Sequence, residues 1–262
     1  MRGADVTATP AVKIAEVPIH AVDLGAAADT IVTKAAQRER LTVHLCNAYV
    51  LALASRDSGY GGLLALGDLN LADGAPVAWF TSRAGVDLRR RPSGAELFEE
   101  VIHRGRAGGL RNYLYGSTPE VVKALSEALT ERYPGAEIVG TESPPFGPVT
   151  DSQAAALALS AASADAHVIW IGLGTPKQDE LVDLLRDRFD GPCVPVGAAF
   201  DFLAGMLPRA PRWMRRVGLE WVYRLAKEPR RLWRRYLWGN VRFLWALVRT
   251  GRVLHETGDP TT

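Results

Sequence analysis

The sequence has few of the residues that hold metals or form disulfides. Its two cysteines, Cys46 and Cys193, stand far apart, so we expect buried small side chains in a reducing compartment and no disulfide. Its five histidines form no His-x-x-x-His pair, which argues against a helical zinc motif. No Asp-x-Asp occurs in the chain, so the hard oxygen ligands that often hold a divalent cation beside a sugar nucleotide are missing. We therefore expect no metal and no cofactor.

Long hydrophobic runs are missing as well. The best candidate, 243–248, is much shorter than the ~20 residues needed to cross a bilayer, and Arg242 and Arg249 bracket it. Residues 1–13 contain no apolar core of signal-peptide length, so we expect no secretion signal. These absences favour a cytoplasmic chain that does not span a membrane.

Positive charge is abundant in one place, the last quarter of the chain. Residues 209–252 hold thirteen Arg or Lys against two acids, so this segment is net +11 and the remainder is net −9 within a total of +2. Arginine beside tryptophan is typical of a surface that meets phosphates and an apolar boundary together. Five of the seven tryptophans lie in the same segment: Trp213, Trp221, Trp233, Trp238 and Trp245.

The 262 residues are enough for one large α/β domain or for a domain with an appendage. Short apolar runs alternate with helix-period segments, which predicts a Rossmann-like open parallel sheet flanked by helices. We expect strands at 41–46, 63–66, 113–115, 136–139, 167–171 and 194–196. Helices are expected from the end of the first strand to residue 53, and at 76–83, 95–104, 119–132, 152–163 and 176–189.

Beyond residue 208 the pattern becomes helical only. The predicted organisation is a flexible N-terminus over 1–15, a catalytic domain over 16–208, a basic and aromatic helical appendage over 209–252 that associates with membranes, and a flexible tail over 253–262.

Residues 171–178 (IGLGTPKQ) follow a buried-type strand and open a helix. Gly172 and Gly174 would let backbone N–H groups approach a phosphate at the helix N-terminus. However, Lys177 takes the place of the third glycine of G-x-G-x-x-G, and no P-loop sequence is present. The pattern alone leaves a nucleotide site and an ordinary tight turn open.

Two further motifs carry candidate polar groups. Asp73 precedes Gly74 at the start of a predicted helix, where it is either a turn residue or a carboxylate that accepts a proton from a hydroxyl. Residues 89–94 (RRRPSG) precede another helix, which Ser93 or Gly94 would cap. Its arginines form either a solvated corner or a clamp for a diphosphate.

These segments, in this order, resemble the WecG/TagA/CpsF glycosyltransferase family, glycosyltransferase family 26, from about residue 43 to about 243. The weaker matches are Asn47 after the first strand, 72–74 (ADG) and 91–94 (RPSG). The stronger ones are 174–179 (GTPKQD) to the family's G-x-P-K-Q-E, 197–205 (GAAFDFLAG) to its G-x-x-F-D-F-x-A-G, and the strings 209–213 (RAPRW), 219–225 (LEWVYRL) and 228–236 (EPRRLWRRY).

The resemblance implies an inverting, metal-independent enzyme of cell-surface polysaccharide synthesis, such as that of teichoic acid. It would move a sugar from a UDP-sugar of the N-acetylmannosamine, mannosaminuronate or glucose type to a polyprenyl-diphosphate-linked saccharide. The implied location is peripheral, on the cytoplasmic face of an anionic membrane, without nucleic acid as a partner and with a homo-oligomer left open.

The resemblance also assigns candidate site residues. Asp73 matches the proposed catalytic base, Arg91 and Gln178 match substrate-site positions, and Asn47 matches an active-site asparagine. Without a metal, Arg91 and tail arginines would stabilise the leaving diphosphate, although a membrane-facing role alone is the alternative for the tail. The remaining candidates for substrate binding are Gly172, Gly174, Lys177, Asp201, Arg224, Arg230, Arg231 and Arg234.

The chain departs from the family's pattern in three places. Leu45 replaces a usual threonine, Thr175 a usual alanine and Asp179 a usual glutamate. Two other function classes fit parts of the sequence: a Rossmann-type nucleotide-dependent oxidoreductase built on Gly172 and Gly174, and a nucleic-acid-binding module built on the Arg/Trp tail. The turn after the first strand, 46–48 (CNA), lacks the glycines that a dehydrogenase would carry there.

Overall fold

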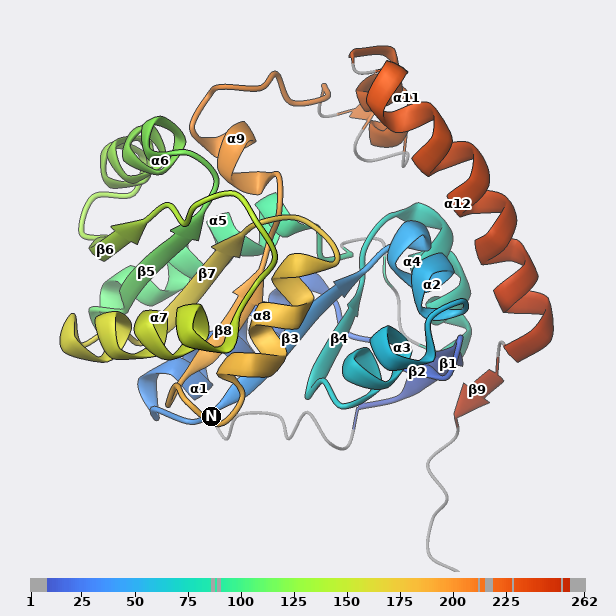
Figure 1. Cartoon of the computed structure of the whole chain (residues 1–262), viewed down its shortest axis with the longest axis horizontal. Coiled ribbons are helices and arrows are strands. Elements are labelled where there is room, and N and C mark those ends of the chain that lie inside the picture. Colours follow the sequence, from blue (N-terminus) through green and yellow to red (C-terminus); the bar gives the residue numbers. More distant parts are fainter. Residues whose placement is uncertain are drawn as a thin grey trace, which may run out of the picture. The chain divides into compact units, whose positions relative to one another are not determined.

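A computed structural model describes residues 9–85, 88, 91–211, 213–214, 219–227, 229–250 and 252–254 (Figure 1). Contacts within the chain divide it into two units. The first takes in 24–45 and 92–209, and the second takes in 5–23, 46–91 and 210–262.

The first unit is built on a parallel sheet with the strand order β6-β5-β7-β8-β3. Each neighbouring pair runs parallel, which confirms the predicted Rossmann-like sheet. The strands are β3 (Leu41–Cys46), β5 (Arg111–Gly116), β6 (Glu137–Glu142), β7 (Val168–Gly172) and β8 (Pro192–Pro195).

Helices cover both faces of this sheet (Figure 1). On β7, Ile169 and Ile171 point into the apolar cluster formed with α7 and α8, whereas Trp170 stacks on Phe98 of α5 with ring centroids 4.3 Å apart. This alternation follows from the two-residue period of a strand that is buried on both faces. The helices of the unit are α1 (Leu24–Ala36), α5 (Gly94–Gly105), α6 (Pro119–Arg132), α7 (Asp151–Ser163), α8 (Lys177–Leu185) and α9 (Ala199–Leu203), with a 3-10 turn η3 (Arg106–Gly108).

The second unit contains a mixed sheet with the order β4-β2-β1-β9, in which β2 runs parallel to β4 and antiparallel to β1. Its strands are β1 (Ala11–Ile14), β2 (Val17–His20), β4 (Leu69–Ala72) and β9 (Arg252–Leu254). Its helices are α2 (Ala48–Ala54), α3 (Ser58–Ala65), α4 (Ala75–Thr81), α11 (Glu220–Lys227) and α12 (Pro229–Thr250), with a 3-10 turn η2 (Ser82–Ala84).

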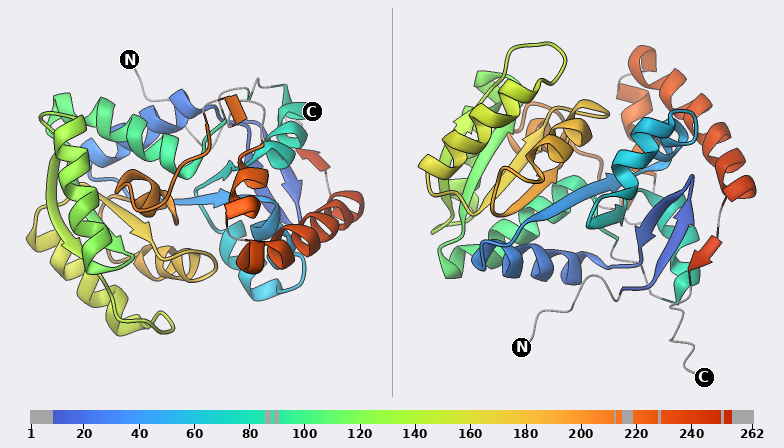
Figure 2. Two further views of the ribbon diagram at one scale, coloured as in Figure 1. Left: turned by 90° about the horizontal axis from the view of Figure 1, so that it is seen from above. Right: turned by 60° about the horizontal axis from the view of Figure 1, so that its bottom comes forward.

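The long helix α12 packs along α2 (Figures 1 and 2). Its inward stripe is Gly239, Phe243 and Ala246, whose spacing of four and three residues keeps them on one side of a helix. Phe243 and Ala246 lie in the apolar core of the unit, and Gly239 lies against Tyr49 of α2. Among the described residues, no helix has the length and the apolar composition needed to cross a bilayer.

The strand predicted at 63–66 is wrong. These residues end helix α3, and the strand β4 begins only at Leu69. Leucine and alanine are strong helix formers, and Asp57 caps the helix by accepting the Tyr60 N–H at 3.1 Å. A short apolar run did not distinguish a buried helix turn from a strand.

The two ends of the chain also differ from expectation. The segment expected to be flexible, 1–15, contains β1, while residues 1–8 lie outside the described part. Strand β9 follows the helices of the tail, where only helices were expected, and 255–262 again lies outside the described residues. The chain from 210 onward belongs to the same unit as 46–91.

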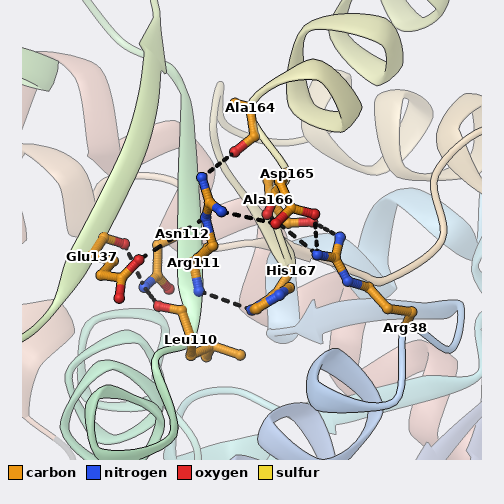
Figure 3. A network of polar contacts seen from close by, with 9 residues as sticks. All are labelled: Arg38, Leu110, Arg111, Asn112, Glu137, Ala164, Asp165, Ala166 and His167. Carbon is orange, nitrogen blue, oxygen red and sulfur yellow. Dashed lines mark hydrogen bonds and ion pairs between the residues drawn. The ribbon is translucent and has the colours of Figure 1, made fainter.

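A polar network joins the amino ends of strands in the first unit (Figure 3). The Arg38 guanidinium donates to the Ala166 carbonyl at 2.7 Å and pairs with the Asp165 carboxylate, which Arg111 also contacts at 2.8 Å. The hydrogen bond from Arg38 lowers the pKa of Asp165. This network fixes the amino ends of the strands. Open α/β sheets bind ligands at the other side, at the carboxyl ends of the strands.

Two histidines extend the backbone hydrogen bonding. His167 Nδ1 accepts the Arg111 N–H at 3.1 Å, and in the second unit His20 Nδ1 accepts the Asn70 N–H at 3.0 Å. Both bonds require an unprotonated Nδ1. Burial lowers the pKa of both imidazoles below the usual 6.5.

We expect stability to fall as the pH drops below about 6.5. Below this pH the histidines of the unfolded state bind protons, whereas those of the folded state stay neutral until the pH reaches their lowered pKa. The stabilisation is therefore fully present above about 6.5, and the free energy of unfolding decreases as the pH falls toward the lowered pKa. The variant His20→Asn/His167→Asn keeps an acceptor oxygen at the position of each Nδ1 but does not titrate. Urea unfolding should show that the free energy of unfolding changes less between pH 7 and pH 5 in this variant than in the wild type. The control His103→Asn, at an exposed site, should show the same change as the wild type. An undiminished difference would contradict the assignment.

Candidate active site

Asp73 and Asn47 come together in the second unit. Asp73 directly follows β4, and Asn47 directly follows β3. The Asp73 backbone N–H donates to the Cys46 carbonyl at 3.1 Å, which holds the two chain segments side by side. The Asn47 Nδ2 amide then lies 3.5 Å from the Asp73 Oδ2, at the long limit of a hydrogen bond.

The orientation of the Asn47 amide is fixed by its capping role. Its Oδ1 accepts the backbone N–H groups of Tyr49 and Val50 at 3.0 and 3.1 Å, as the N-cap of α2. Because the oxygen is engaged there, the NH2 group is the part of the amide that faces Asp73. Asn47 therefore directs an N–H donor toward the Asp73 carboxylate.

Gly74 determines how the carboxylate is presented. It is the N-cap of α4 and has φ +81°, a conformation that side chains with a Cβ rarely adopt. The chain thus turns from β4 into α4 immediately after Asp73, and the half-buried Asp73 stands at the N-terminus of that helix. This arrangement places a half-buried carboxylate, a possible proton acceptor by its chemistry, directly after a strand.

The candidate arginines of the second unit lie in one loop and on two helices. Arg91 precedes the α5 segment and is half-buried, Arg224 lies on α11 and is half-buried, and Arg230 is exposed in the first turn of α12. The backbones of Arg231 and Arg234 belong to α12, but their side chains lie outside the described part. Their contact with a diphosphate remains a prediction.

In the first unit, the turn after β7 is braced from within. Gln178 is buried, and its Oε1 accepts the Gly174 N–H at 3.0 Å. Gly174 has φ +79°, and a Cβ placed on it would meet no atom within 4 Å. Gln178 therefore shapes an open, glycine-containing turn at the carboxyl end of a parallel strand, the position where such sheets bind ligands.

Three other predicted site residues have structural contacts of their own. A Cβ on Gly172 would lie 2.6 Å from the Phe200 ring, so packing alone requires a glycine there. Lys177 Nζ donates to the Gly147 carbonyl at 2.6 Å. Asp201 lies in α9, and its backbone carbonyl accepts two N–H groups of the following turn. Substrate binding by these residues stays a prediction.

Ser93 occupies the N-cap position of α5, as expected for one of the two capping candidates, but its side chain makes no capping hydrogen bond. The following Gly94 is required by packing, since a Cβ built on it would lie 2.8 Å from the Val196 carbonyl oxygen.

No group of three or more metal-ligand side chains occurs within the described part of the chain.

One buried ionisable pair was not predicted from the sequence. His44 of β3 and Asp179 of α8 are 0% and 1% exposed, and His44 Nδ1 lies 3.0 Å from Asp179 Oδ1. The His44 Nε2 is buried without a partner among the described residues. Because Asp179 directly follows Gln178, the pair anchors the first turn of α8 to the sheet. A histidine inside an apolar strand was the signal that could have revealed it.

Breaking this pair should destabilise the fold strongly. His44→Leu leaves a buried carboxylate without its imidazole, so we expect a loss of about 3–5 kcal/mol in the free energy of unfolding. The double variant His44→Leu/Asp179→Leu should lose less, because both polar groups are then gone. The control Asp183→Asn breaks a part-exposed pair with Arg186 on the same helix and should cost below about 1 kcal/mol. Additive losses in the double variant would refute the coupling.

Comparison with known proteins places this chain. A 31% identical relative from Bacillus spizizenii (strain ATCC 23059 / NRRL B-14472 / W23) matches 185 residues, 70% of each chain. A 29% identical relative from Bacillus subtilis (strain 168) matches 202 residues, 77% of each chain. Both are named N-acetylglucosaminyldiphosphoundecaprenol N-acetyl-beta-D-mannosaminyltransferase. The sequence model of the Glycosyl transferase WecG/TagA/CpsF family matches residues 12–256, which confirms the resemblance read from the motifs. The chain therefore belongs to the WecG/TagA/CpsF family of glycosyl transferases.

Proposed function

We propose that this protein transfers N-acetylmannosamine from its UDP-sugar to N-acetylglucosaminyl-diphosphoundecaprenol, with inversion at the anomeric carbon. The observation that carries the proposal is the Asp73 carboxylate beside the oriented Asn47 amide, at the ends of two strands. The transferred sugar and the acceptor are taken from the names of the two relatives, whereas UDP as the carrier is what the family resemblance implies. Family membership sets aside the oxidoreductase and the nucleic-acid-binding alternatives.

Asp73 acts as the general base in this proposal. It accepts the proton of the acceptor hydroxyl as that oxygen attacks the anomeric carbon, and the bond to UDP breaks on the opposite side of the sugar ring. A single displacement inverts the configuration, by the logic of a one-step inverting hydrolase with a sugar hydroxyl in place of water. Asn47 supports the reaction by holding the carboxylate in one direction.

Arginines and backbone amides stabilise the departing UDP in the metal-independent mechanism that we propose. Arg91 and the tail residues Arg224, Arg230, Arg231 and Arg234 are the candidate cations, because a guanidinium binds phosphate oxygens in a bidentate manner. The N-terminus of α8, which follows the Gly174 turn, also favours anions through the helix dipole.

The proposed location is the cytoplasmic surface of an anionic membrane, where the lipid-linked acceptor lies. Helix α12 supports a location at the membrane surface, because its residues Trp233, Trp245 and Arg249 are exposed. Tryptophan at the interface and basic residues near anionic lipids both favour peripheral association.

The substrate assignment is tested by a donor screen. The purified full chain is mixed with N-acetylglucosaminyl-diphosphoundecaprenol and, in turn, UDP-N-acetylmannosamine, UDP-N-acetylmannosaminuronate and UDP-glucose. Mass spectrometry should detect product with the first donor, and NMR should show a β-linkage from the α-linked donor. Retained configuration would exclude the single displacement.

The same assay tests the metal-independent step. Turnover should persist in excess EDTA. Arg91→Gln should lower turnover both with and without EDTA, because in this mechanism the guanidinium, and not a metal, supplies the positive charge at the diphosphate. Loss of activity in EDTA that Mg²⁺ or Mn²⁺ restores would contradict this mechanism.

Asp73→Asn should lower turnover by about 10²–10⁴-fold, because the amide has the same shape but cannot accept the proton. UDP binding and the thermal unfolding midpoint should stay close to wild type. Asp68→Asn, which changes an exposed carboxylate just before β4, is the matched control and should keep its activity. Asp73 is not the base if the Asn variant retains more than half of the wild-type turnover.

A further inference from the structure

A surface cavity of about 900 Å³ opens in the second unit at the C-terminal end of α2. Ser55 and Arg56 from the segment after α2, Gly61 and Gly62 from α3, and the second half of α12 line it. Its volume falls in the range of about 300–1,000 Å³ that is common for small-ligand sites. Asn47 caps the other end of α2, about 10 Å away along a helix of this length, so the cavity is separate from the Asp73 site.

The lining of this cavity is cationic. Arg56, Arg242 and Arg249 contribute guanidinium groups, and the one acid that also lines the cavity, Glu16, is paired with Lys13 at 2.7 Å. Neither Arg56 nor Arg249 forms an ion pair with any residue that the structure describes. A cavity with this composition favours an anion that accepts several N–H bonds, such as a phosphate.

A missing side chain keeps the cavity open. Gly62 lies on the exposed side of α3, and a Cβ built on it would meet no atom within 4 Å. Glycine in the middle of a helix is destabilising relative to alanine, and no close contact requires it at this position. The effect of Gly62 is to leave space beside the arginines.

Exposed apolar residues on α12 adjoin the residues that line the cavity. Along α12, Leu244, Trp245 and Val248 are 60%, 65% and 85% exposed, and Trp245 itself lines the cavity. The Arg249 guanidinium lies 5.9 Å from the centroid of the Trp245 ring, within cation–π distance. A free phosphate ion would make no use of these exposed apolar groups, whereas a bilayer would cover them.

We propose that this cavity binds the phosphate of an anionic phospholipid headgroup. The arginines contact the phosphate oxygens, and Leu244, Trp245 and Val248 enter the apolar boundary of the same bilayer. The site goes beyond the transfer reaction, because it recognises a lipid of the membrane and not the donor or the acceptor. It would also fix α12, which packs on α2, against the membrane surface.

Vesicle flotation of the full chain tests the proposal, with phosphatidylcholine vesicles compared with vesicles that contain phosphatidylglycerol. Arg56→Gln and Arg249→Gln should each weaken binding to the anionic vesicles about fivefold, the expected effect of one basic residue near an anionic leaflet. Lys123→Gln, on the exposed side of α6, removes the same charge elsewhere and should weaken it less than twofold.

The decisive variant is Gly62→Gln, which fills the cavity without changing the charge of the protein. It should weaken binding to anionic vesicles about as much as Arg56→Gln. Gly108→Gln is its control, because a Cβ on Gly108 also meets no atom within 4 Å. Thermal unfolding verifies that each variant is folded. Vesicle binding that is equal for Gly62→Gln and Gly108→Gln would overturn the proposal.

A second arm separates lipid from soluble anion. Calorimetric titration of the wild type with inorganic phosphate should show at most weak binding. Tight phosphate binding that Gly62→Gln abolishes, together with unchanged vesicle binding, would assign the cavity to a soluble anion and overturn the lipid assignment. Both measurements are independent of turnover, so they fail or succeed separately from the proposed transferase function.

Discussion

The backbone hydrogen bond from the Asp73 N–H to the Cys46 carbonyl, 3.1 Å long, is the constraint on which the candidate active site depends. It fixes the end of β4 against the end of β3, so the first side chain after each strand must lie beside the other. Asn47 can then use its oxygen to cap α2 and its NH2 group to face Asp73, and one residue both starts a helix and orients the carboxylate. Gly74 completes the arrangement because its positive φ lets α4 begin without displacing Asp73.

Much of the first unit could be predicted from the sequence, because its parallel strands are buried on both faces and read as continuous apolar runs. The strand 41–46 and the helix 119–132 were predicted with their observed bounds, the helix being marked by Pro119 and its cap Thr118. The second unit was harder. Its strands β1 and β2 have only four residues each and join through Ala15 and Glu16, both at positive φ and without the glycine or asparagine that announces such a turn.

Candidate site residues could be predicted where a short motif contains the reactive groups. They could not be predicted where contacts between distant parts of the chain determine the role of a residue. Asp73 and Asn47 were named from short strings, and the structure brings them within 3.5 Å. Gly172 shows the limit of such reasoning, because the Phe200 ring fills the space that a phosphate-binding glycine would leave open. The His44–Asp179 pair joins residues 135 positions apart, and no local pattern reports a contact of that separation.

The structure shows the contacts of two residues that depart from the family's motifs, Leu45 and Asp179. A glutamate at 179 would extend its carboxylate by one methylene toward the His44 imidazole, and overpacking of a buried site costs about 1–3 kcal/mol. The shorter Asp179 places its carboxylate 3.0 Å from the His44 Nδ1. Leu45 is buried, and its Cδ1 would lie 3.2 Å from a Cβ on Gly94, so it adds apolar contact at the start of α5 where a threonine would offer a hydroxyl. Both changes alter the contacts around β3, whereas the two candidate site residues, Asp73 and Asn47, match the family's pattern.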